Sequence, residues 1–343
     1  MVAELRVLHV GPGTATTGGM ATVIGLLSGS VRSGIRHESA DAWSPDSKTH
    51  GLRSTVLLIY RLLSSKRSRP DWIHAHLSER GSFLREGAVL LVARALGVGT
   101  AATVHGAEFI AFSERHPDLV RRILSSCRVV FTLGPHAAAR ASALCSATPV
   151  TQIMNPVDLD ELAGAAPSSM RSSVLFGGEV GQRKGVDRLV AAWPEVRRRH
   201  PGATCVLCGP LGDVEVDHLP EGMTYLGSVP RRQLLGLLKT TDVACLPSRD
   251  EALPMFILES LALGVPVVTT SVGEIGQLGE TQGVALSDGD PSDIAARLDE
   301  LLGDREKRTE WGRRGSEWAR EKCSVESVSH SLGVAYRTDR GTK

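Results

Sequence analysis

The sequence predicts an α/β protein made of two doubly wound domains, each with a parallel sheet. Short apolar runs alternate with longer helical patterns along the whole chain, which is typical of parallel α/β domains. The chain has 343 residues, more than one hydrophobic core usually serves, so two domains are expected. The residues that could bind a ligand follow directly after the apolar runs, where open α/β sheets bind their ligands.

The predicted strands divide between two halves of the chain. In the first half they are Arg6–Val10, Trp72–His76, Thr100–His105, Val129–Leu133 and Val150–Met154. In the second half they are Val174–Gly177, Thr204–Cys208, Met223–Leu226, Val243–Pro247, Pro266–Thr270 and Gly283–Leu286. Helical patterns lie between them and include 186–199 and 231–238. Residues 155–173 are rich in Ala, Ser and Pro and have little strand character, so we interpret them as an interdomain linker.

Composition argues against several classes of protein. The 39 Lys and Arg residues balance 38 Asp and Glu residues, whereas a nucleic-acid-binding protein usually has a basic excess. We therefore expect no nucleic-acid partner. Basic runs occur at 61–69 and 197–199, either as solvated helix ends and loops or as contacts to an anionic membrane surface or a lipid-linked acceptor.

The sequence favours a cytoplasmic location, with the inner membrane surface as the alternative for the basic runs. No segment reaches the roughly 18 to 20 apolar residues that span a bilayer, and the first residues lack a signal-peptide pattern. Six cysteines in a chain of this length are typical of reduced thiols in a cytosolic protein. Cys205 and Cys208 form a CxxC pattern, but they lie in an apolar stretch that indicates a buried strand rather than a metal site.

Two features of the first half indicate ligand contacts. A glycine-rich loop follows the first predicted strand and contains Gly11, Gly13, Gly18 and Gly19. Glycines let a backbone approach a phosphate or sugar, but this loop matches neither common nucleotide fingerprint, so a flexible turn remains the alternative. His105 and Gly106 follow a predicted strand, where the imidazole either bonds a polar ligand or is structural. His74 and His76 share one face of a short strand without a third ligand, so we expect no metal site there.

Two stretches of the second half carry the more specific signals. In 176–189 a strand enters glycines, and then Arg183 and Lys184 open a helix, a suitable site for a diphosphate. In 243–270 a strand is followed by Glu251, by Pro254 at the expected first position of a helix, and by Glu259 within it. Carboxylates accept hydrogen bonds from sugar hydroxyls, and the first N–H groups of the helix could hold phosphate or sugar oxygens.

With these motifs in order, the chain resembles glycosyltransferase family 4, the retaining enzymes of the GT-B fold. The resemblance covers nearly the whole chain and rests on GGM near the start, HGxE, NPVD, GxxxxxKG, YLGSV and two glutamates eight positions apart. The glutamate block is specific and the other motifs are supportive. The resemblance implies two Rossmann-like domains that face a central cleft. An acceptor domain would cover 1–156, a donor domain 157–325, and a C-terminal helix over 326–343 would return to the first domain.

The resemblance also implies roles for single residues. Arg183 and Lys184 would bind the donor diphosphate, Glu251 would hold hydroxyls of the donor sugar, and His105 would contact that sugar near the reacting centre. The remaining donor contacts would come from Glu259 at the ribose and from Gly18, Gly19, Val229, Ala252, Leu253, Met255 and Phe256. Acceptor candidates are Glu108, Ser82 and Arg85. The family often has Gly-Arg where this chain has Gly178 and Glu179, so one phosphate-binding arginine is missing.

The implied activity is metal-independent, retaining transfer of a sugar from a nucleotide-diphosphate donor to a hydroxyl acceptor, without a cofactor. The acceptor could be a sugar, a lipid-linked molecule or a small molecule. Arg231 is not an acid that would pair with guanine, which favours a UDP-sugar. Alternatives are a nucleotide-sugar 2-epimerase of the same fold and a non-catalytic nucleotide-sugar-binding partner of another transferase. A dinucleotide oxidoreductase would need the GxGxxG pattern, which is missing from the first loop.

Overall fold

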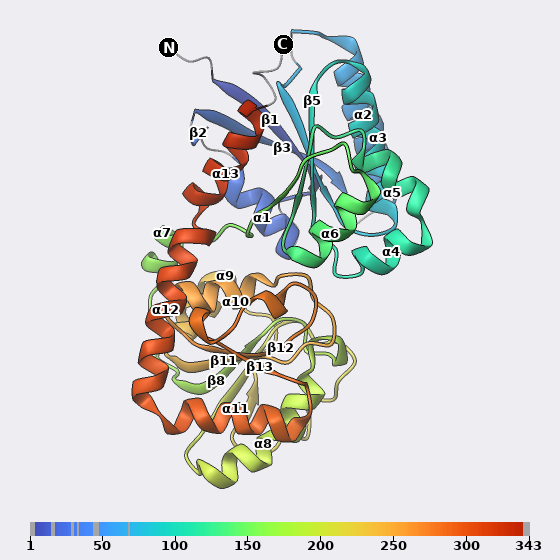
Figure 1. Cartoon of the computed structure of the whole chain (residues 1–343). Coiled ribbons are helices and arrows are strands. Elements are labelled where there is room, and N and C mark those ends of the chain that lie inside the picture. Colours follow the sequence, from blue (N-terminus) through green and yellow to red (C-terminus); the bar gives the residue numbers. More distant parts are fainter. Residues whose placement is uncertain are drawn as a thin grey trace. The chain divides into compact units, whose positions relative to one another are not determined.

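A computed structural model describes residues 4–14, 18–28, 31–32, 34–43, 48–67 and 69–338. The chain forms two compact units, the first from Met1–Pro156 with Val325–Lys343 and the second from Val157–Ser324. Each unit contains one sheet with helices packed against it, as Figure 1 shows. The predicted α/β class with two parallel sheets is thereby confirmed.

The first unit is built on a seven-stranded sheet in the order β2-β3-β1-β4-β5-β6-β7. All neighbouring strands are parallel except β2, which pairs with β3 in antiparallel fashion. The strands are β1 (Leu5–Pro12), β2 (Val31–Arg32), β3 (Ile35–Trp43), β4 (Trp72–Leu77), β5 (Gly99–Val104), β6 (Val129–Thr132) and β7 (Val150–Gln152). Strands β4, β5 and β6 are buried along their whole length, so both of their faces are covered, and polar side chains such as His74 and His76 are buried with the apolar ones.

The prediction that only helical stretches separate the first two strands of this half was wrong, because β2 and β3 lie there. β3 alternates between buried and more exposed positions, and one of its inward positions carries His37 instead of an apolar residue. A strand with polar residues on both faces has no apolar run to reveal it. β3 also lies near the sheet edge, next to the short strand β2.

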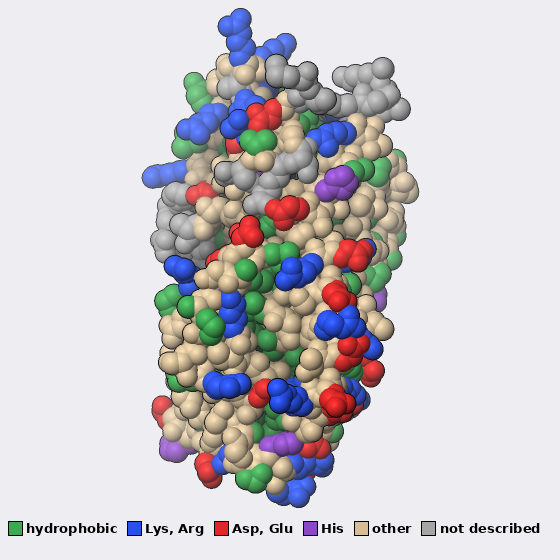
Figure 2. Space-filling model, turned by 90° about the vertical axis from the view of Figure 1, so that its left-hand side faces the viewer, with side chains coloured by type: hydrophobic (Ala, Val, Ile, Leu, Met, Phe, Trp, Pro, Cys, Tyr) green, Lys and Arg blue, Asp and Glu red, His purple; other side chains and the backbone are tan. Residues whose placement is uncertain are grey.

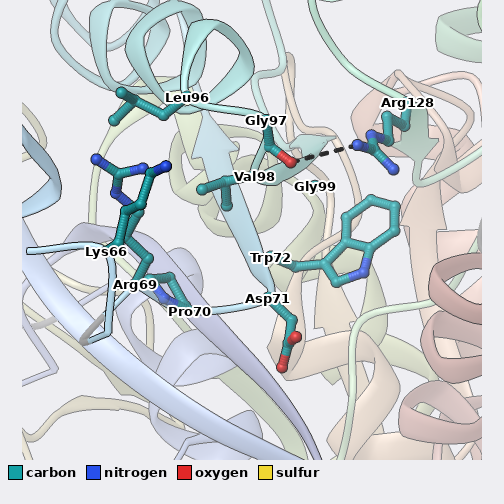
Figure 3. A pocket seen from close by; sticks show the side chains of 10 residues that line it. All are labelled: Lys66, Arg69, Pro70, Asp71, Trp72, Leu96, Gly97, Val98, Gly99 and Arg128. Carbon is teal, nitrogen blue, oxygen red and sulfur yellow. Dashed lines mark hydrogen bonds between the residues drawn. The ribbon is translucent and has the colours of Figure 1, made fainter.

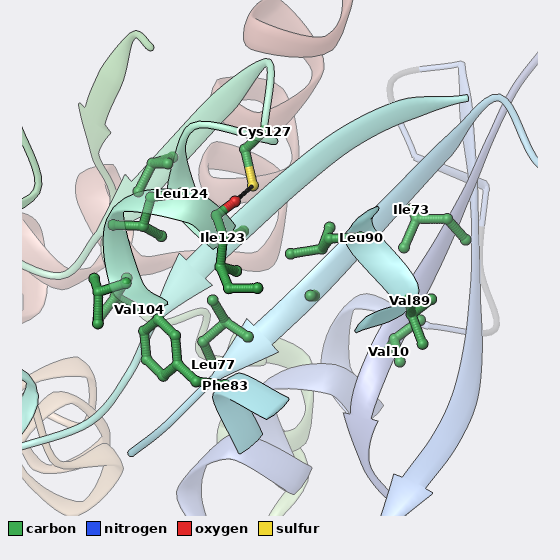
Figure 4. Close-up of a cluster of buried hydrophobic side chains, with 14 of the residues drawn as sticks. Val10, Ile73, Leu77, Phe83, Val89, Leu90, Val104, Ile123, Leu124 and Cys127 are labelled. Carbon is green, nitrogen blue, oxygen red and sulfur yellow. Dashed lines mark hydrogen bonds between the residues drawn. The ribbon is translucent and has the colours of Figure 1, made fainter. Parts of the chain in front are cut away.

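Helices cover both faces of the first sheet, with α1 and α13 on one side and α2, α3 and α5 on the other (Figure 1). Apolar side chains from strands and helices meet in one core cluster, which includes Val10, Leu77 and Val104 of the sheet and Phe83 and Ile123 of the helices (Figure 4). The helices are α1 (Gly19–Leu27), α2 (Lys48–Ser64), α3 (Gly81–Ala95), α4 (Phe109–Arg115), α5 (Pro117–Leu124), α6 (Pro135–Leu144) and α13 (Val325–Thr338).

The second unit has a six-stranded, wholly parallel sheet in the order β10-β9-β8-β11-β12-β13. Its strands are β8 (Ser172–Gly177), β9 (Cys205–Cys208), β10 (Met223–Tyr225), β11 (Thr241–Leu246), β12 (Val267–Thr270) and β13 (Val284–Ser287). Its helices are α7 (Leu159–Gly164), α8 (Val186–Arg199), α9 (Arg231–Leu238), α10 (Met255–Ala262), α11 (Pro291–Gly303) and α12 (Arg305–Cys323). α8 and α11 pack together on one face, and α9 and α10 lie on the other (Figure 1).

Residues 157–173 of the segment that we interpreted as a linker belong to the second unit and are partly helical, which corrects that prediction, whereas Asn155 and Pro156 belong to the first unit. Asp158 caps α7 by accepting hydrogen bonds from the N–H groups of Asp160 and Glu161, at 3.0 and 2.9 Å. The helix is only six residues long, too short for a helical period to appear in the sequence.

The surface that carries α12 has interspersed acidic and basic side chains (Figure 2). On α12, for example, Arg313 pairs with Glu310 and Glu317 at 2.8 and 2.7 Å. Exposed pairs of this kind contribute little to stability, because solvent screens them. None of the helices within the described ranges is both long enough and apolar enough to cross a membrane.

Candidate functional site

In the second unit, the candidate donor residues lie beyond the carboxyl ends of β8 and β11, the two central strands. After β8 the chain passes through a short 3₁₀ turn, η1 (Gln182–Lys184), to Gly185, where α8 begins. Gly185 has a φ of +76°, and a Cβ atom there would lie 1.9 Å from the carbonyl oxygen of Pro247. Glycine therefore allows the turn after β8 to press against the end of β11, which brings Lys184 to the loop after β11.

Lys184 and Glu251 form an ion pair between the Nζ and Oε1 atoms, although 67 positions separate them in the sequence. Both side chains are largely buried, with 15% and 9% of their area exposed. Ser248 Oγ donates a second hydrogen bond to Glu251 Oε1, at 3.2 Å. Arg183 is half exposed and lies 4.0 Å from both Glu251 and Glu179. The fold thus gathers two cations and one buried carboxylate, with Glu179 close to the outer cation.

Glu259 lies in the middle of α10 and is buried, and its charge is balanced by Arg231. Arg231 Nη1 donates to Glu259 Oε1 at 2.5 Å, and its Nε atom lies 2.9 Å from Glu161 of α7. Burial raises the pKa of Glu259, while Arg231 opposes that rise. Burial alone would lower the pKa of Arg231, but Glu259 and Glu161 outweigh it and raise that pKa. The sequence indicates Arg231 only in connection with the nucleobase of the donor. Its contacts with Glu161 and Glu259, which lie on two other helices, have no local sequence signal.

The backbone between Glu251 and Glu259 forms the start of α10. The helix begins at Met255, with Pro254 as its N-cap, so Pro254 lies one position earlier than the sequence predicts. Leu253, Met255 and Phe256 are buried, whereas Ala252 is partly exposed. The first N–H groups of any α-helix have no intrahelical acceptor and carry a partial positive charge, so they can bind oxyanions. Val229, the expected base contact, is half-buried in the loop between β10 and α9.

In the first unit, His105 follows β5 at its carboxyl end and is half-buried. Its backbone N–H donates to the carbonyl of Leu77 at 2.8 Å, which ties the residue to the end of β4. Gly106 comes next, and a Cβ atom there would lie 1.8 Å from Oε1 of Glu79. That same oxygen accepts the N–H of Glu108 at 2.9 Å. The motif after β5 is therefore tied to the end of β4 by a backbone hydrogen bond and to the Glu79 carboxylate by the N–H of Glu108.

His105 is the last member of a chain of four hydrogen-bonded imidazoles inside the sheet. His37 Nδ1 lies 2.8 Å from His9 Nε2, His9 Nδ1 lies 2.9 Å from His76 Nε2, and His76 Nδ1 lies 2.9 Å from His105 Nε2. Burial, reinforced by neighbouring imidazoles, lowers the pKa of His9 and of His76, and burial lowers the pKa of His105 to about 3. His9, His76 and His105 are therefore neutral at neutral pH, and a neutral imidazole with both nitrogens bonded donates one N–H and accepts another.

The structure corrects the expectation that His74 and His76 lack a third histidine nearby. His9 is the register partner of His74 on the neighbouring strand β1, and ring nitrogens of the three lie within 4.8 Å of one another. Both nitrogens of His74 are engaged, with Tyr336 Oη at 2.5 Å and Thr103 Oγ1 at 2.6 Å. Both nitrogens of His9 and His76 bond to other imidazoles. This saturation favours a hydrogen-bonded cluster over a metal centre.

The other candidates of the first unit lie at the amino-terminal ends of α1, α3 and α4. Gly18 is exposed, has a φ of +140°, and precedes the first helical residue, Gly19. Glu108 is half exposed and lies 3.7 Å from Arg80. Ser82 is buried, and its Oγ atom accepts the N–H of Ser78 at 3.1 Å. Arg85 is a quarter exposed and lies 3.7 Å from the carboxylate of Glu86.

Glu86 provides a stability test beside these acceptor candidates. It is buried in α3, and burial raises its pKa from 4.5 to about 7, although Arg85 opposes the rise. Below pH 4.5 both folded and unfolded states hold the proton, so the carboxyl costs nothing. As the pH rises to 7 the unfolded state ionises first, and stability is lost. We expect Glu86→Gln to raise the free energy of unfolding by roughly 3 kcal/mol at pH 8 and by little at pH 4.

Urea unfolding of Glu86→Gln and of the wild type at both pH values measures this difference. Glu114→Gln is the matched control, because Glu114 is exposed in the neighbouring helix α4. A variant that is no more stable than the wild type at pH 8 would show that the Glu86 carboxylate is well solvated or paired.

Asp-x-Asp triplets, the usual metal motif of sugar-nucleotide enzymes, occur twice in the chain, at 158–160 and 288–290. Asp158 caps α7, as described above. Asp290 caps α11 by accepting the N–H of Ser292 at 2.8 Å, and Asp288 accepts the N–H of Asp290 at 2.8 Å. Both triplets thus have a structural use as helix caps and turns.

Comparison with known proteins finds similarity between the second unit and one sequence family. Residues 164–318 match the family described as glycosyl transferases group 1. The chain is 27% identical over 283 residues to glycogen synthase of Mycobacterium tuberculosis, which covers 74% of this chain and 66% of that enzyme. It is 28% identical over 250 residues to a GDP-mannose-dependent α-(1-6)-phosphatidylinositol monomannoside mannosyltransferase of the same organism, with 65% of each chain covered. The chain thus spans about two thirds of the length of these relatives.

Solved structures share the fold over nearly the whole chain. Sucrose-phosphate synthase of Thermosynechococcus elongatus superposes with a TM-score of 0.75 at 16% identity and covers 99% of this chain and 100% of that one. Anabaena HepE in complex with UDP gives a TM-score of 0.73 at 13% identity, with 97% and 100% covered. These likenesses establish the GT-B fold of two Rossmann-like domains.

Proposed function

We propose that this protein is a retaining, metal-independent glycosyltransferase that moves a sugar from a nucleotide-diphosphate donor to a hydroxyl acceptor. One observation carries the proposal: Arg183, Lys184 and Glu251 converge at the carboxyl edge of the second sheet, next to the start of α10. Two cations and the helix N-terminus suit a diphosphate, and a buried carboxylate suits sugar hydroxyls. These residues lie within the part that matches glycosyl transferases group 1.

The proposed reaction breaks the bond between the anomeric carbon and the donor diphosphate. The electron pair of that bond stays on the diphosphate oxygen, and Lys184, Arg183 and the α10 N–H groups stabilise the developing charge. The acceptor oxygen forms the new bond to the anomeric carbon from the same face, and its proton passes to a phosphate oxygen of the leaving group. Fixed protein cations would take the place that a metal ion has in other transferases.

The ion pair between Lys184 and Glu251 suggests how the site is kept ready for the donor. A buried charge without a partner is costly, so each side chain neutralises the other when no donor is present. In the proposed complex, the diphosphate becomes a second partner for Lys184. The carboxylate of Glu251 then remains available for sugar hydroxyls, with Ser248 still donating to it.

For the first unit, we propose that His105 meets the donor sugar through Nδ1, since Nε2 is bonded to His76. The chain of imidazoles allows two tautomers of a neutral His105. When His76 donates to His105, the Nδ1 atom of a neutral His105 carries the proton and is a donor. When all bonds in the chain reverse, Nδ1 is an acceptor. The acceptor substrate would bind on the same unit, with Glu108, Ser82 and Arg85 as candidate contacts.

We favour a UDP-sugar as the donor. Arg231 engages Glu259 and Glu161, so the start of α9 offers a cation rather than a carboxylate for the N–H edge of guanine. The UDP bound to HepE is in line with this choice. The mannosyltransferase relative, by contrast, is named as GDP-mannose-dependent, so both bases belong in the test.

The test is nucleotide release from UDP-, GDP-, ADP- and dTDP-sugars in the presence of a chelator, with donor binding measured by calorimetry. We expect one donor class to be bound and slowly cleaved, and Glu251→Gln to lose about 100-fold or more of the release rate. Glu317→Gln is the control, because Glu317 is an exposed carboxylate of α12 in the same unit. Early proton NMR spectra should show that the released sugar keeps the donor's anomeric configuration.

Other results would change the proposal. If the wild type binds none of the nucleotide sugars, the protein is not a transferase of this kind. A released sugar with altered configuration at C2 would indicate an epimerase. Release that stops in the chelator would show that a metal ion is required after all.

A further inference from the structure

The outer face of α2 is apolar, whereas the outer face of a surface helix is usually polar. Gly51, Thr55, Leu58 and Leu62 form the inner face and are buried against the sheet and α3. The outer face carries large apolar side chains that are 56 to 66% exposed, namely Leu52, Val56, Leu57, Tyr60 and Leu63. We call these five residues the outer stripe. They are five of the eleven exposed large hydrophobic side chains found in the described ranges, so their exposure is concentrated rather than scattered.

The same segment is strongly basic. Between residues 48 and 70 the sequence has no Asp or Glu and has six cations, namely Lys48, Arg53, Arg61, Lys66, Arg67 and Arg69. The whole chain, by contrast, has a net charge of only +1. On the outer face of α2, Arg53 and Arg61 are exposed beside the outer stripe. An apolar stripe flanked by arginines is the pattern of helices that lie in the interface of an anionic bilayer.

A cationic pocket adjoins the end of this helix (Figure 3). It has a volume of about 510 Å³ and is lined by Lys66 and Arg69 on one side and Arg128 on the other. Arg69 Nε donates to the carbonyl of Leu62 at 2.7 Å, and Arg128 Nη2 donates to that of Gly97 at 3.5 Å, so both guanidinium groups are held in place. The one carboxylate in the lining, Asp71, accepts the backbone N–H of Arg6 at 2.8 Å.

The pocket lies at the amino ends of the strands. Trp72 and Gly99, which line it, are the first residues of β4 and β5. The residues proposed for transfer in this unit, such as His105, follow the carboxyl ends, which lie at the other edge of the sheet. Because β4 and β5 each have six residues, roughly 20 Å separates the two edges. The pocket is therefore distinct from the proposed reaction site.

We propose that the outer stripe of α2 and the adjoining cationic pocket together dock this protein onto an anionic lipid bilayer. The stripe enters the boundary between headgroups and acyl chains, and the pocket takes a lipid phosphate. A binding site for free phosphate would not explain the exposed apolar residues of the outer stripe. A second copy of the chain, docked through the same face, would bring two sets of like charges together. A bilayer with anionic headgroups matches both the apolar and the basic features.

The test is sedimentation of the whole chain with vesicles of phosphatidylcholine alone or mixed with phosphatidylglycerol. We expect about tenfold or greater preference for the mixed vesicles, and loss of that preference in 1 M salt, where the Debye length is about 3 Å. Leu57→Gln with Leu63→Gln should weaken binding about tenfold by removing apolar contact. Lys66→Gln with Arg67→Gln should weaken it by a similar factor through the lost charges.

Matched controls come from the second unit. Leu211→Gln removes an exposed apolar side chain, and Lys322→Gln removes an exposed cation, and neither should alter vesicle binding. Equal binding to both kinds of vesicle, or binding that the α2 variants leave unchanged, would overturn the proposal. So would a stable dimer that the Leu57→Gln and Leu63→Gln changes dissociate, because the stripe would then be a protein interface. Donor cleavage in solution should be the same in all these variants, so this test and the test of the proposed transfer can fail separately.

Discussion

Replacing Lys184 with alanine is expected to lower kcat for donor cleavage by about 100- to 1,000-fold. Lys184 would lose its contact with the charge that develops on the leaving diphosphate. In addition, Glu251 would remain as a largely buried carboxylate without its main cationic partner, close to where the diphosphate binds. KM for the donor should therefore rise as well, since repulsion acts before the bond breaks.

Steady-state rates with the donor found by the nucleotide panel measure this prediction. Lys322→Ala is the matched control, because Lys322 is an exposed lysine of α12 in the same unit. Adding Glu251→Gln to Lys184→Ala should lower KM again by removing the unpaired carboxylate, while kcat stays low. If Lys184→Ala lowers kcat by less than about tenfold, Lys184 has no part in stabilising the leaving group.

Replacing Arg231 with methionine is expected to lower the free energy of unfolding by roughly 3 to 5 kcal/mol at pH 7 to 8. Arg231 balances the charge of Glu259, which has only 2% of its side chain exposed. Without the guanidinium group, burial raises the pKa of Glu259 further above that of the unfolded chain. The penalty is present above the unfolded pKa and disappears below it, where both states are protonated. The loss should therefore shrink as the pH falls towards 4.

Denaturant unfolding of Arg231→Met at several pH values tests whether the loss of stability becomes smaller as the pH falls. Arg198→Met is the control, because Arg198 is an exposed arginine whose solvent-screened pair with Glu195 should contribute little to stability. Adding Glu259→Gln should recover most of the lost stability, because no unpaired charge then remains. A loss that does not depend on pH, or that the double variant does not recover, would indicate that packing of the arginine side chain matters more than its charge.

The sequence predicts where each residue of the candidate donor site lies along the chain, but it does not predict the contact between them. Arg183, Lys184 and Glu251 were each expected at the end of a strand, because apolar runs followed by Gly or Ser mark those ends. That Lys184 and Glu251 touch depends on β8 and β11 being neighbours in the sheet, with Val174 opposite Val243. Strand order is a long-range property, and neither local sequence contains it.

The histidine cluster also depends on strand order, which the local sequence does not contain. The sequence places His74 and His76 on one face of a strand, because they are two positions apart. The link to His9 comes from the pairing of β1 with β4, and the link to His37 comes from β3, a strand without an apolar run. Only the assembled sheet shows that four imidazoles in four strands or strand ends share one chain of hydrogen bonds.

From the sequence by itself, the α/β class and most strands of this protein could be determined, because strands buried on both faces need continuous apolar runs. The bounds of α8 and α9 also agree with the periodic pattern. The tertiary structure decided which apolar residues are buried. α2 is apolar on two faces, and the sequence cannot tell which face the sheet covers and which, with Leu57 and Tyr60, is left to solvent. Burial depends on what packs against a side chain, and that partner comes from elsewhere in the chain.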